Sequence, residues 1–264
     1  MAIAKQRTHR PAKKPHFPKL LVYSRNKKGK TTFAVSAGIP QTIVLDPEEG
    51  TDLMKHKNPY VWEVKKWADV DEFWGAIRTM KLSPRELGLG PEREPFKFVS
   101  CDGLTKLNNM ALKHVGRIAE ERGDLDRIPG MVKRQDYFKS NELMKDFINN
   151  LHQLRMGVIF TAQERIITDG NGDDDVEQED AAQYYVPDIP AGVRATVNQV
   201  VDVIARLYVV TVETKSGPKK QRRLQIGIHD SYDTGFRSDY ILPDIMKNPT
   251  VPKLVRLMET GSET

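Results

Sequence analysis

One loop near the N-terminus constrains this chain more than any other segment. It reads SRNKKGKTT, residues 24–32, and follows the apolar run LLVY at residues 20–23. The run predicts a buried strand, and residues 31–37 predict the start of a helix. The pattern G-x-x-x-x-G-K-[ST] between a strand and a helix is typical of a phosphate-binding loop, because backbone N–H groups at the helix N-terminus surround phosphate oxygens. The predicted phosphate-binding residues are Ser24, Arg25, Asn26, Lys27, Lys28, Gly29, Lys30, Thr31 and Thr32.

Three residues of this loop have separate expected roles. Gly29 permits a left-handed or closely approaching backbone. Lys30 would reach the β- and γ-phosphates of a nucleotide, and the Thr31 hydroxyl would bind magnesium. An ordinary basic turn is the alternative, but the flanking strand and helix favour the phosphate-binding loop. The sequence therefore predicts ATP and Mg2+ as cofactors, with Ser24 in place of the first glycine as a departure from the pattern.

Apolar runs alternate with helical segments along most of the chain. Further strands are expected at residues 42–45, 96–101 and 157–162, and the clearest helix at residues 136–155. Asp69 or Asp71 would cap another helix, whose apolar positions recur at helical spacing. Those positions are Val70, Phe73, Ile77 and Met80. Repeated strand–helix units favour parallel pairing, so the expected fold class is α/β, with a mainly parallel sheet flanked by helices on both faces.

The charge distribution divides the chain into three parts. Residues 1–19 contain six basic residues and no acid, and we expect a flexible basic N-terminal arm there. Residues 20–243 form the expected ATPase core, with an acidic mobile loop at 169–180 and a hairpin region at 200–229 around the turn KSGPKK. Residues 244–264 are expected to be a loosely packed tail with one short helix near 254–258.

Composition argues against membrane insertion and export. No run approaches the roughly 20 apolar residues of a membrane helix, so we expect no membrane partner. The basic N-terminus lacks the apolar stretch of a secretory signal. The single cysteine, Cys101, cannot form an internal disulfide and suits a reducing cytoplasm. The net charge of +5 indicates, weakly, a polyanionic partner.

Polar residues follow the predicted strands, which is where ligands bind in sheets of this kind. The second strand is followed by DPEE, which includes Glu48 and Glu49. The third strand ends at Asp102, the position of a carboxylate that orients magnesium, although a helix cap is the alternative. The fourth strand runs into Gln163, where a sensor of the γ-phosphate would lie. The sequence thus predicts that these groups meet at one edge of the sheet.

The order GKTT, LDPEEG, a strand into Asp102 and then FTAQE resembles the RecA-like recombination ATPases. The resemblance implies that Glu48 polarises the attacking water, with Glu49 as the alternative, and that Gln163 senses the γ-phosphate. Within that group the chain is most similar to short phage ATPases of single-strand annealing, the RecA-like branch of the Sak-type proteins. That similarity covers about residues 20–243 and includes the segments QDYFKSNELMKDFINNL, PDIPAG, VVDVIARL and RRLQ.

The resemblance implies a RecA-like P-loop ATPase that hydrolyses ATP slowly and is stimulated by DNA. Lys30, Glu48 and Gln163 would be the catalytic residues, with Thr31 and Asp102 at the metal. The implied partners are single-stranded DNA, other copies of the chain in a head-to-tail ring or filament, and a phage single-strand-binding protein, all in the host cytoplasm. Two alternatives remain: a nucleotide-gated DNA-binding filament with negligible hydrolysis, and an accessory P-loop ATPase that acts on a protein partner.

Three basic regions are candidates for the DNA surface. They are the N-terminal arm, which is otherwise a solubilising tail, the pair Lys133 and Arg134, and a cluster around the hairpin turn. RecA-like proteins place a basic group at the γ-phosphate of the neighbouring subunit, and the hairpin cluster is a candidate for that role or for a solvated tip. Its members are Lys215, Lys219, Lys220, Arg222 and Arg223.

Four aromatic residues are further candidates for DNA binding, and two positions differ from the RecA-like pattern. Stacking on bases is one role for the aromatics, and packing in the core is the other. The aromatics in question are Tyr137, Phe138, Tyr184 and Tyr185. Gly103 stands where the family usually has serine. The acidic loop lies where the family has a DNA-binding loop, so either it turns away from DNA or other residues bind DNA.

Overall fold

Six neighbouring parallel strands, from β7 to the edge strand β3, form most of a ten-stranded sheet in the computed structural model, which describes residues 15–38, 41–123, 128–168 and 183–262. Along the sheet the order is β10-β8-β7-β1-β5-β4-β2-β3. The parallel strands are β1 (Lys19–Ser24), β2 (Thr42–Asp46), β3 (Tyr60–Glu63), β4 (Phe98–Asp102), β5 (Gly157–Thr168) and β7 (Val203–Thr214). The expected α/β class is therefore confirmed.

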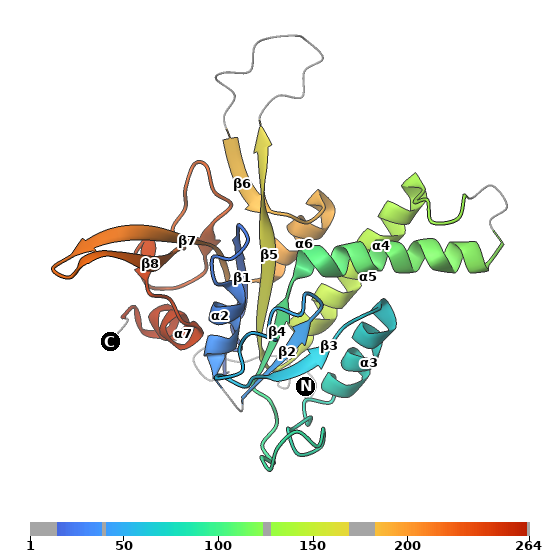
Figure 1. The fold of residues 1–264 in the computed structure, drawn as a ribbon, viewed down its shortest axis with the longest axis horizontal. Coiled ribbons are helices and arrows are strands. Elements are labelled where there is room, and N and C mark those ends of the chain that lie inside the picture. Colours follow the sequence, from blue (N-terminus) through green and yellow to red (C-terminus); the bar gives the residue numbers. More distant parts are fainter. Residues whose placement is uncertain (1–14, 39–40, 124–127, 169–182, 263–264) are drawn as a thin grey trace, which may run out of the picture.

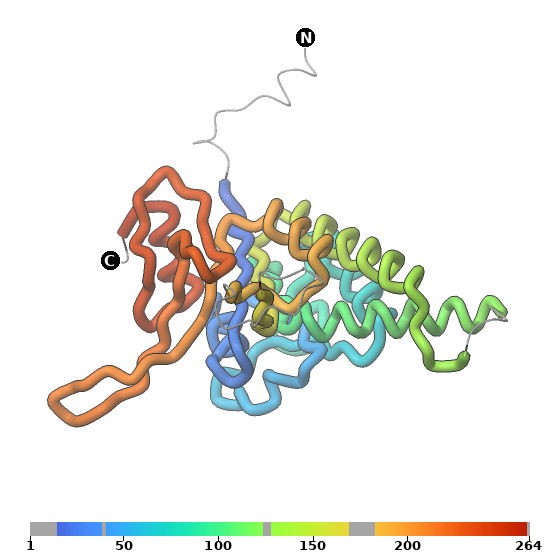
Figure 2. The backbone as a smooth tube through the Cα atoms, turned by 90° about the horizontal axis from the view of Figure 1, so that it is seen from above, coloured from blue at the N-terminus to red at the C-terminus, as the bar shows by residue number. Residues whose placement is uncertain are grey.

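Antiparallel strands extend this sheet on the β7 side and at the end of β5. They are β6 (Gln183–Pro187) on β5, β8 (Gly217–Gln225) and β9 (Gly235–Phe236) on β7, and β10 (Ile245–Lys247) on β8. The β7–β8 ribbon is the predicted hairpin, with a turn of two residues between Thr214 and Gly217. Figure 2 shows this ribbon extending from one side of the molecule and the two longest helices extending from the other.

Helices cover both faces of the sheet (Figure 1), because successive residues of the central strands point to opposite faces. Leu21 and Tyr23 of β1 face one core and Leu20 and Val22 face the other. The first core is covered by α3 (Trp67–Ile77), α4 (Leu104–Glu121), α5 (Arg134–Gln153) and α6 (Ala191–Val200). The second is covered by α2 (Lys30–Ala34), the 3-10 turn η2 (Val35–Ala37) and α7 (Val251–Thr260).

The C-terminal segment corrects the expectation of a loosely packed tail. Its strand β10 pairs with β8, and α7 buries four apolar residues in the second core. Pro252 does not disturb α7, because proline is tolerated in the first turn of a helix. The packed core therefore extends past residue 243. The buried residues of α7 are Val251, Leu254, Leu257 and Met258.

The last residue of the expected N-terminal arm belongs to the sheet instead. Lys19 belongs to β1 and is buried, with its Nζ donating to the backbone oxygens of Leu154 (2.9 Å) and Met156 (2.5 Å). Burial lowers the pKa of Lys19 to about 8, and the charge of Asp202 partly offsets this effect. Residues 1–14 of the expected arm and the expected acidic loop at 169–180 lie outside the described residues.

Helix α3 differs from its prediction at both ends. Asp69 is in the first turn and accepts hydrogen bonds from the backbone N–H groups of Lys65 and Lys66, so it stabilises the helix start from inside the helix. Neither Asp69 nor Asp71 is the cap residue, which is Lys66. Met80 lies beyond the helix with a left-handed φ of 56° and is exposed rather than part of the apolar face.

Several elements were not expected from the sequence. They are β3, β6, β9, β10 and α6, all short, and the second half of α4. Short elements of this kind gain their stability from tertiary pairing and packing rather than from a local periodic pattern. Within the described residues, no helix has the length and apolarity to cross a membrane.

Candidate active site

The phosphate-binding loop connects β1 to α2 at the carboxyl edge of the sheet. Its left-handed residues are Lys27 (φ 61°) and Gly29 (φ 105°). Ser24 is the last, fully buried residue of β1, paired with Gln163 of β5, and its hydroxyl donates to the Arg25 carbonyl oxygen. The first position of the loop is thus ordinary strand backbone. A serine is accommodated there because no left-handed conformation is needed, which explains the departure from the glycine pattern.

Lys30 follows the loop as the first residue of α2 and is buried. Its Nζ donates to the Ser24 carbonyl oxygen (3.2 Å), to the Arg25 carbonyl oxygen (3.4 Å) and to Oε1 of Gln163 (2.9 Å). Burial lowers the pKa of Lys30, while the charges of Glu48 and Asp102 act in the opposite direction. The first helical hydrogen bond is Phe33 N–H to Gly29 O, so the N–H groups before Phe33 have no partner within α2 and suit an anion.

Asp102 and Thr31 form a pair of hard oxygen ligands beside the loop. Asp102 ends β4, is buried, and accepts hydrogen bonds from the hydroxyls of Thr31 and Thr161, the latter at 2.7 Å. Desolvation raises the pKa of Asp102, and the two hydroxyl bonds partly counter the rise. A Cβ atom at Gly50 would lie 3.2 Å from Thr31 Oγ1 and 3.5 Å from Asp102 Oδ2, so the glycine keeps this space open.

These residues fit magnesium in the manner of a nucleotide site. The described residues contain no cluster of three or more His, Cys, Asp or Glu side chains that would enclose a metal by themselves. One hydroxyl and one carboxylate, completed by phosphate oxygens and water, are the ligands that Mg2+ takes at nucleotide sites. Thr31 and Asp102 would hold the ion.

The turn after β2 distinguishes Glu48 from Glu49. Asp46 organises this turn by accepting bonds from backbone N–H groups, and Glu49 adopts a left-handed φ of 56°. Glu48 extends toward the loop, where its Oε2 lies 3.5 Å from Nε2 of Gln163. Burial and the charge of Asp102 raise the pKa of Glu48, against the effect of Lys30. Glu48, not Glu49, therefore faces the phosphate-binding loop.

Gly103 is required by the position of Glu48. Its φ is 128°, and a Cβ atom there would lie 3.0 Å from Oε1 of Glu48. A serine at this position would be strained and would displace the glutamate. The departure from the family pattern at Gly103 thus has a structural reason.

Gln163 connects Lys30, beside the phosphate-binding loop, with Glu48, in the turn after β2. It lies on β5 between β1 and β4, and its backbone N–H donates to Thr105 Oγ1 (3.0 Å). Its side chain contacts both Lys30 and Glu48. All of the predicted catalytic and metal-binding residues therefore meet at one edge of the sheet, whereas Arg25, Asn26 and Lys27 are exposed on the outside of the loop.

A buried ion-pair network next to Gln163 was not predicted from the sequence. Glu164 binds Arg206 of β7 through Nε (2.6 Å) and NH2 (3.3 Å) and also contacts Nε of Arg25 at 3.3 Å. The Arg206 guanidinium lies over the rings of Tyr185 (4.9 Å) and Tyr232 (4.3 Å). A lone arginine in the apolar run VIARLYVV was the signal that could have revealed it.

The aromatic residues that were candidates for base stacking are partly exposed and partly packed. Tyr137 and Phe138 are 52% and 70% exposed at the start of α5, where Phe138 lines a hollow with Lys133 and Arg134. Tyr185 packs on Arg206 instead of being available to bases. Tyr184, on β6, is 36% exposed.

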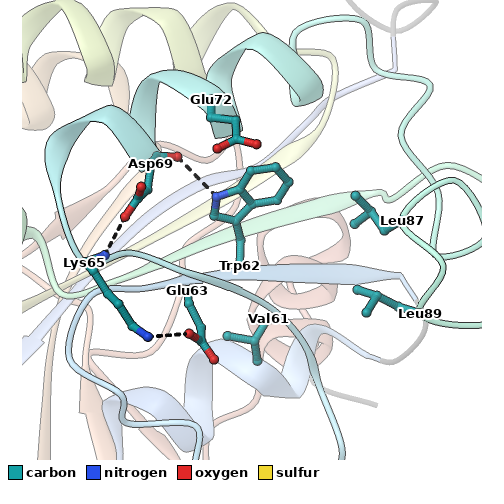
Figure 3. Close-up of a pocket in the computed structure, with 8 residues that line it drawn as sticks. All are labelled: Val61, Trp62, Glu63, Lys65, Asp69, Glu72, Leu87 and Leu89. Atoms are coloured by element: carbon teal, nitrogen blue, oxygen red, sulfur yellow. Dashed lines mark hydrogen bonds and ion pairs between the residues drawn. The ribbon is translucent and has the colours of Figure 1, made fainter.

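A second hollow runs along β3 at the free edge of the sheet (Figure 3). Its apolar side chains come from β3 and from the segment before β4, and Trp62 donates from Nε1 to the Asp69 carbonyl oxygen. Lys65 forms an ion pair with Glu63 at the rim. None of the predicted site residues lines this hollow. Its lining residues are Val61, Trp62, Glu63, Lys65, Asp69, Glu72, Leu87 and Leu89.

Comparison with known proteins identifies the family. Among solved structures, a KaiC-like protein from the hyperthermophilic archaeon Pyrococcus horikoshii is 13% identical, with a TM-score of 0.42 over 84% of each chain. No curated protein matches the sequence. The family model described as an AAA domain matches residues 16–238, which include every predicted site residue. The chain therefore belongs to the AAA domain family and is a P-loop ATPase.

Proposed function

We propose that this chain hydrolyses ATP with Mg2+ at the described site and couples hydrolysis to binding of single-stranded DNA in phage-type recombination or strand annealing. The observation that carries the hydrolytic part is the convergence of Lys30, Glu48, Asp102 and Gln163 around the loop. A nucleophile-activating carboxylate, a phosphate-binding lysine and a metal-orienting carboxylate are the groups that phosphoryl transfer requires.

Each residue has a distinct role in the proposed mechanism. The loop N–H groups and Lys30 hold the phosphates, and Thr31 and Asp102 hold the magnesium, which would neutralise charge on the β- and γ-phosphates. Glu48 orients the attacking water and takes its proton, for which a raised pKa is suitable. Gln163 contacts both Lys30 and Glu48, so it can register the γ-phosphate between them.

Steady-state ATPase measurements on three variants test the mechanism. Lys30→Ala is expected to abolish nucleotide binding. Glu48→Gln should retain binding and lower turnover by about a hundredfold or more, because general-base catalysis contributes factors of this size. Glu49→Gln is the matched control and should turn over like the unmodified protein. Undiminished turnover in Glu48→Gln would show that the water is activated by another group.

The DNA part of the proposal is supported by the start of α5. Two largely exposed aromatic rings, Tyr137 and Phe138, lie on the same turn of helix as Arg134 and beside Lys133. Aromatic rings with neighbouring cations bind single strands through base stacking and phosphate contacts. Such large rings usually find an apolar partner within a monomer, and their exposure here favours a binding role.

Binding of labelled single-stranded DNA, measured with and without ATP and Mg2+ over a salt series, tests this part. Binding should weaken steeply with salt and should require nucleotide. Phe138→Ala should weaken it by about tenfold or more, since one base stack contributes about 1–3 kcal/mol. Tyr208→Ala, at a partly buried position on β7, provides the control.

The hollow along β3 favours a second candidate, an accessory ATPase that acts on a protein partner. An open sheet edge beside apolar side chains suits an added polypeptide segment. If the chain binds no single-stranded DNA at low salt while ATP hydrolysis is retained, this candidate replaces the DNA one. We further propose a cytoplasmic protein that assembles head to tail, with a phage single-strand-binding protein as an additional partner.

A further inference from the structure

The basic cluster of the β7–β8 ribbon is divided between two faces. Lys220 and Arg222 alternate with Gln221 and Arg223 along β8, so the first two point to the face opposite the second two. Arg223 Nε donates to Oε1 of Gln221 on its own face. Lys220 and Arg222 instead line a cavity together with residues of the phosphate-binding loop.

Arg222 lies directly against the loop of its own chain. A Cβ atom at Gly29 would lie 2.5 Å from Nε and 3.1 Å from Cζ of Arg222. The backbone around Arg222 is anchored, because its carbonyl oxygen accepts from Asn248 N–H (2.9 Å) and β8 pairs with both β7 and β10. Arg222 is exposed, and its guanidinium lies against the glycine that precedes Lys30.

The cavity next to this contact is strongly basic. It has a volume of about 520 Å³, within the range of small-molecule sites. Of the described residues that line it, five are basic and none is acidic. Thr32 of α2 and Ser36 of η2, one helical turn apart, form one wall, and Ser36 Oγ accepts from Val251 N–H to join η2 and α7. The basic residues are Lys27, Lys28, Lys57, Lys220 and Arg222.

The position of the cavity in the sheet indicates which part of a bound nucleotide would lie next to it. Thr31, Asp102 and Glu48 lie toward β2 and β4, and define the side of the γ-phosphate. Thr32 and Arg222 lie toward β8, on the other side of β1 in the sheet. Of the parts of a bound nucleoside triphosphate, the α-phosphate and the nucleoside would extend toward this second side.

We propose that Arg222 binds the nucleotide in cis, and that its guanidinium and the surrounding lysines contact the α-phosphate and nucleoside end. This inference rests on the proposed ATP-binding function. Arginine suits the position because its planar fork can bind a phosphate through two N–H groups or stack on a base. Arg222 is thus a binding residue of its own subunit, and the basic group expected at a neighbour's γ-phosphate has to come from another residue.

Affinities for ADP and ATP, measured by calorimetry, test this assignment. Removal of the charge in Arg222→Met should weaken both nucleotides by the same factor of about ten or more, because the contact does not involve the γ-phosphate. Arg222→Lys should recover most of the affinity. Arg223→Met, one residue away on the opposite face, should bind like the unmodified protein.

The variants separate the possible outcomes. A role in supporting Gly29 by packing alone predicts that Arg222→Met, which keeps the aliphatic stem, binds normally, and that result would overturn the proposal. A second contrary result is that Arg222→Met keeps its ADP affinity and loses ATP turnover only at protein concentrations high enough for subunits to associate. That result would overturn the proposal and show that Arg222 contacts the nucleotide of a neighbouring subunit. If Lys30→Ala also binds nucleotide normally, the proposed ATP site itself is wrong. If Lys30→Ala loses binding and Arg222→Met does not, only the assignment of Arg222 is wrong.

Discussion

Strands β2 and β4 each end in a buried aspartate at the same edge of the sheet, but the two carboxylates are bonded in different ways. Asp46 accepts from three backbone N–H groups and from the Thr51 hydroxyl at 2.6 Å. The hydrogen-bond partners that the structure gives Asp102 are two hydroxyls, those of Thr31 and Thr161. The same residue type thus serves two purposes.

The difference follows from the kind of donor. A backbone N–H has a fixed direction, so the bonds of Asp46 hold the turn that carries Glu48 in one conformation. A hydroxyl can rotate, and it both donates and accepts. Thr31 and Asp102 can therefore give up the hydrogen bond between them and use the same oxygen atoms to bind a cation. Asp46 is therefore a structural carboxylate, and Asp102 is one that is able to bind a metal.

The largest expected effect comes from Asp102→Asn. Turnover of ATP should fall by about a thousandfold or more, because a carboxylate that orients the metal is replaced by a neutral amide. The amide oxygen can still accept from the Thr161 hydroxyl, so folding is retained. Parallel ATPase assays and thermal unfolding measure the two effects. A variant with normal turnover would place the metal elsewhere.

Breaking the ion pair between Glu164 of β5 and Arg206 of β7 should cost the most stability. Glu164→Gln leaves the partly buried Arg206 against tyrosine rings without this carboxylate partner, which should lower the free energy of unfolding by about 3 kcal/mol or more. The control is Glu142→Gln, which breaks an exposed pair with Lys145 and should cost less than about 1 kcal/mol. Urea unfolding of both variants provides the comparison.

Asp46→Asn should destabilise the protein in proportion to the donors left unsatisfied. The donors around Asp46 bond to its two carboxylate oxygens, whereas the amide of asparagine has one acceptor oxygen. We therefore expect a loss of about 2–3 kcal/mol in the free energy of unfolding. Asp52→Asn, at an exposed position of the same turn, is the control. An equal effect of both substitutions on the denaturant midpoint would remove the distinction between structural and metal-binding carboxylates.

The pH dependence of stability should show the cost of burying the charged Asp102 carboxylate. Its pKa is raised in the folded protein, mainly by desolvation, so the folded state binds more protons than the unfolded state in the interval between the two pKa values. Stability from this group is present below the unfolded pKa and is lost as pH rises through the folded pKa. At neutral pH, Asp102→Asn should therefore unfold at a higher temperature than the unmodified protein. The difference should disappear in acid, and a constant difference at all pH values would contradict this account.

The smallest effect is expected at the end of β1. Ser24 has strand conformation, so Ser24→Gly adds freedom to the unfolded chain without relieving strain. A loss of about 0.5–1 kcal/mol in stability is expected, with turnover changed by less than about twofold. A large gain in nucleotide affinity would show that the serine distorts the loop. Urea unfolding and ATP titration supply the two numbers.

Much of the site could be predicted because its residues follow apolar strands. Lys30, Thr31, Asp102 and Gln163 each lie at or just after a run that is buried along the chain, and parallel strands bring their carboxyl ends to one edge. Neighbouring residues were harder to separate. Glu48 and Glu49 are adjacent and chemically alike, and only the backbone of the turn, with Glu49 in a left-handed conformation, places Glu48 next to Gln163.

The sequence by itself determined the parallel α/β class, the phosphate-binding loop and the order of the carboxylates, because these depend on short-range patterns of apolar and polar residues. Only the tertiary structure decided which groups meet across distant segments. Glu164 pairs with Arg206, and Arg222 rests on Gly29, because β7 and β8 continue the sheet on the side of β1. Such contacts depend on strand order and register, which local patterns do not encode.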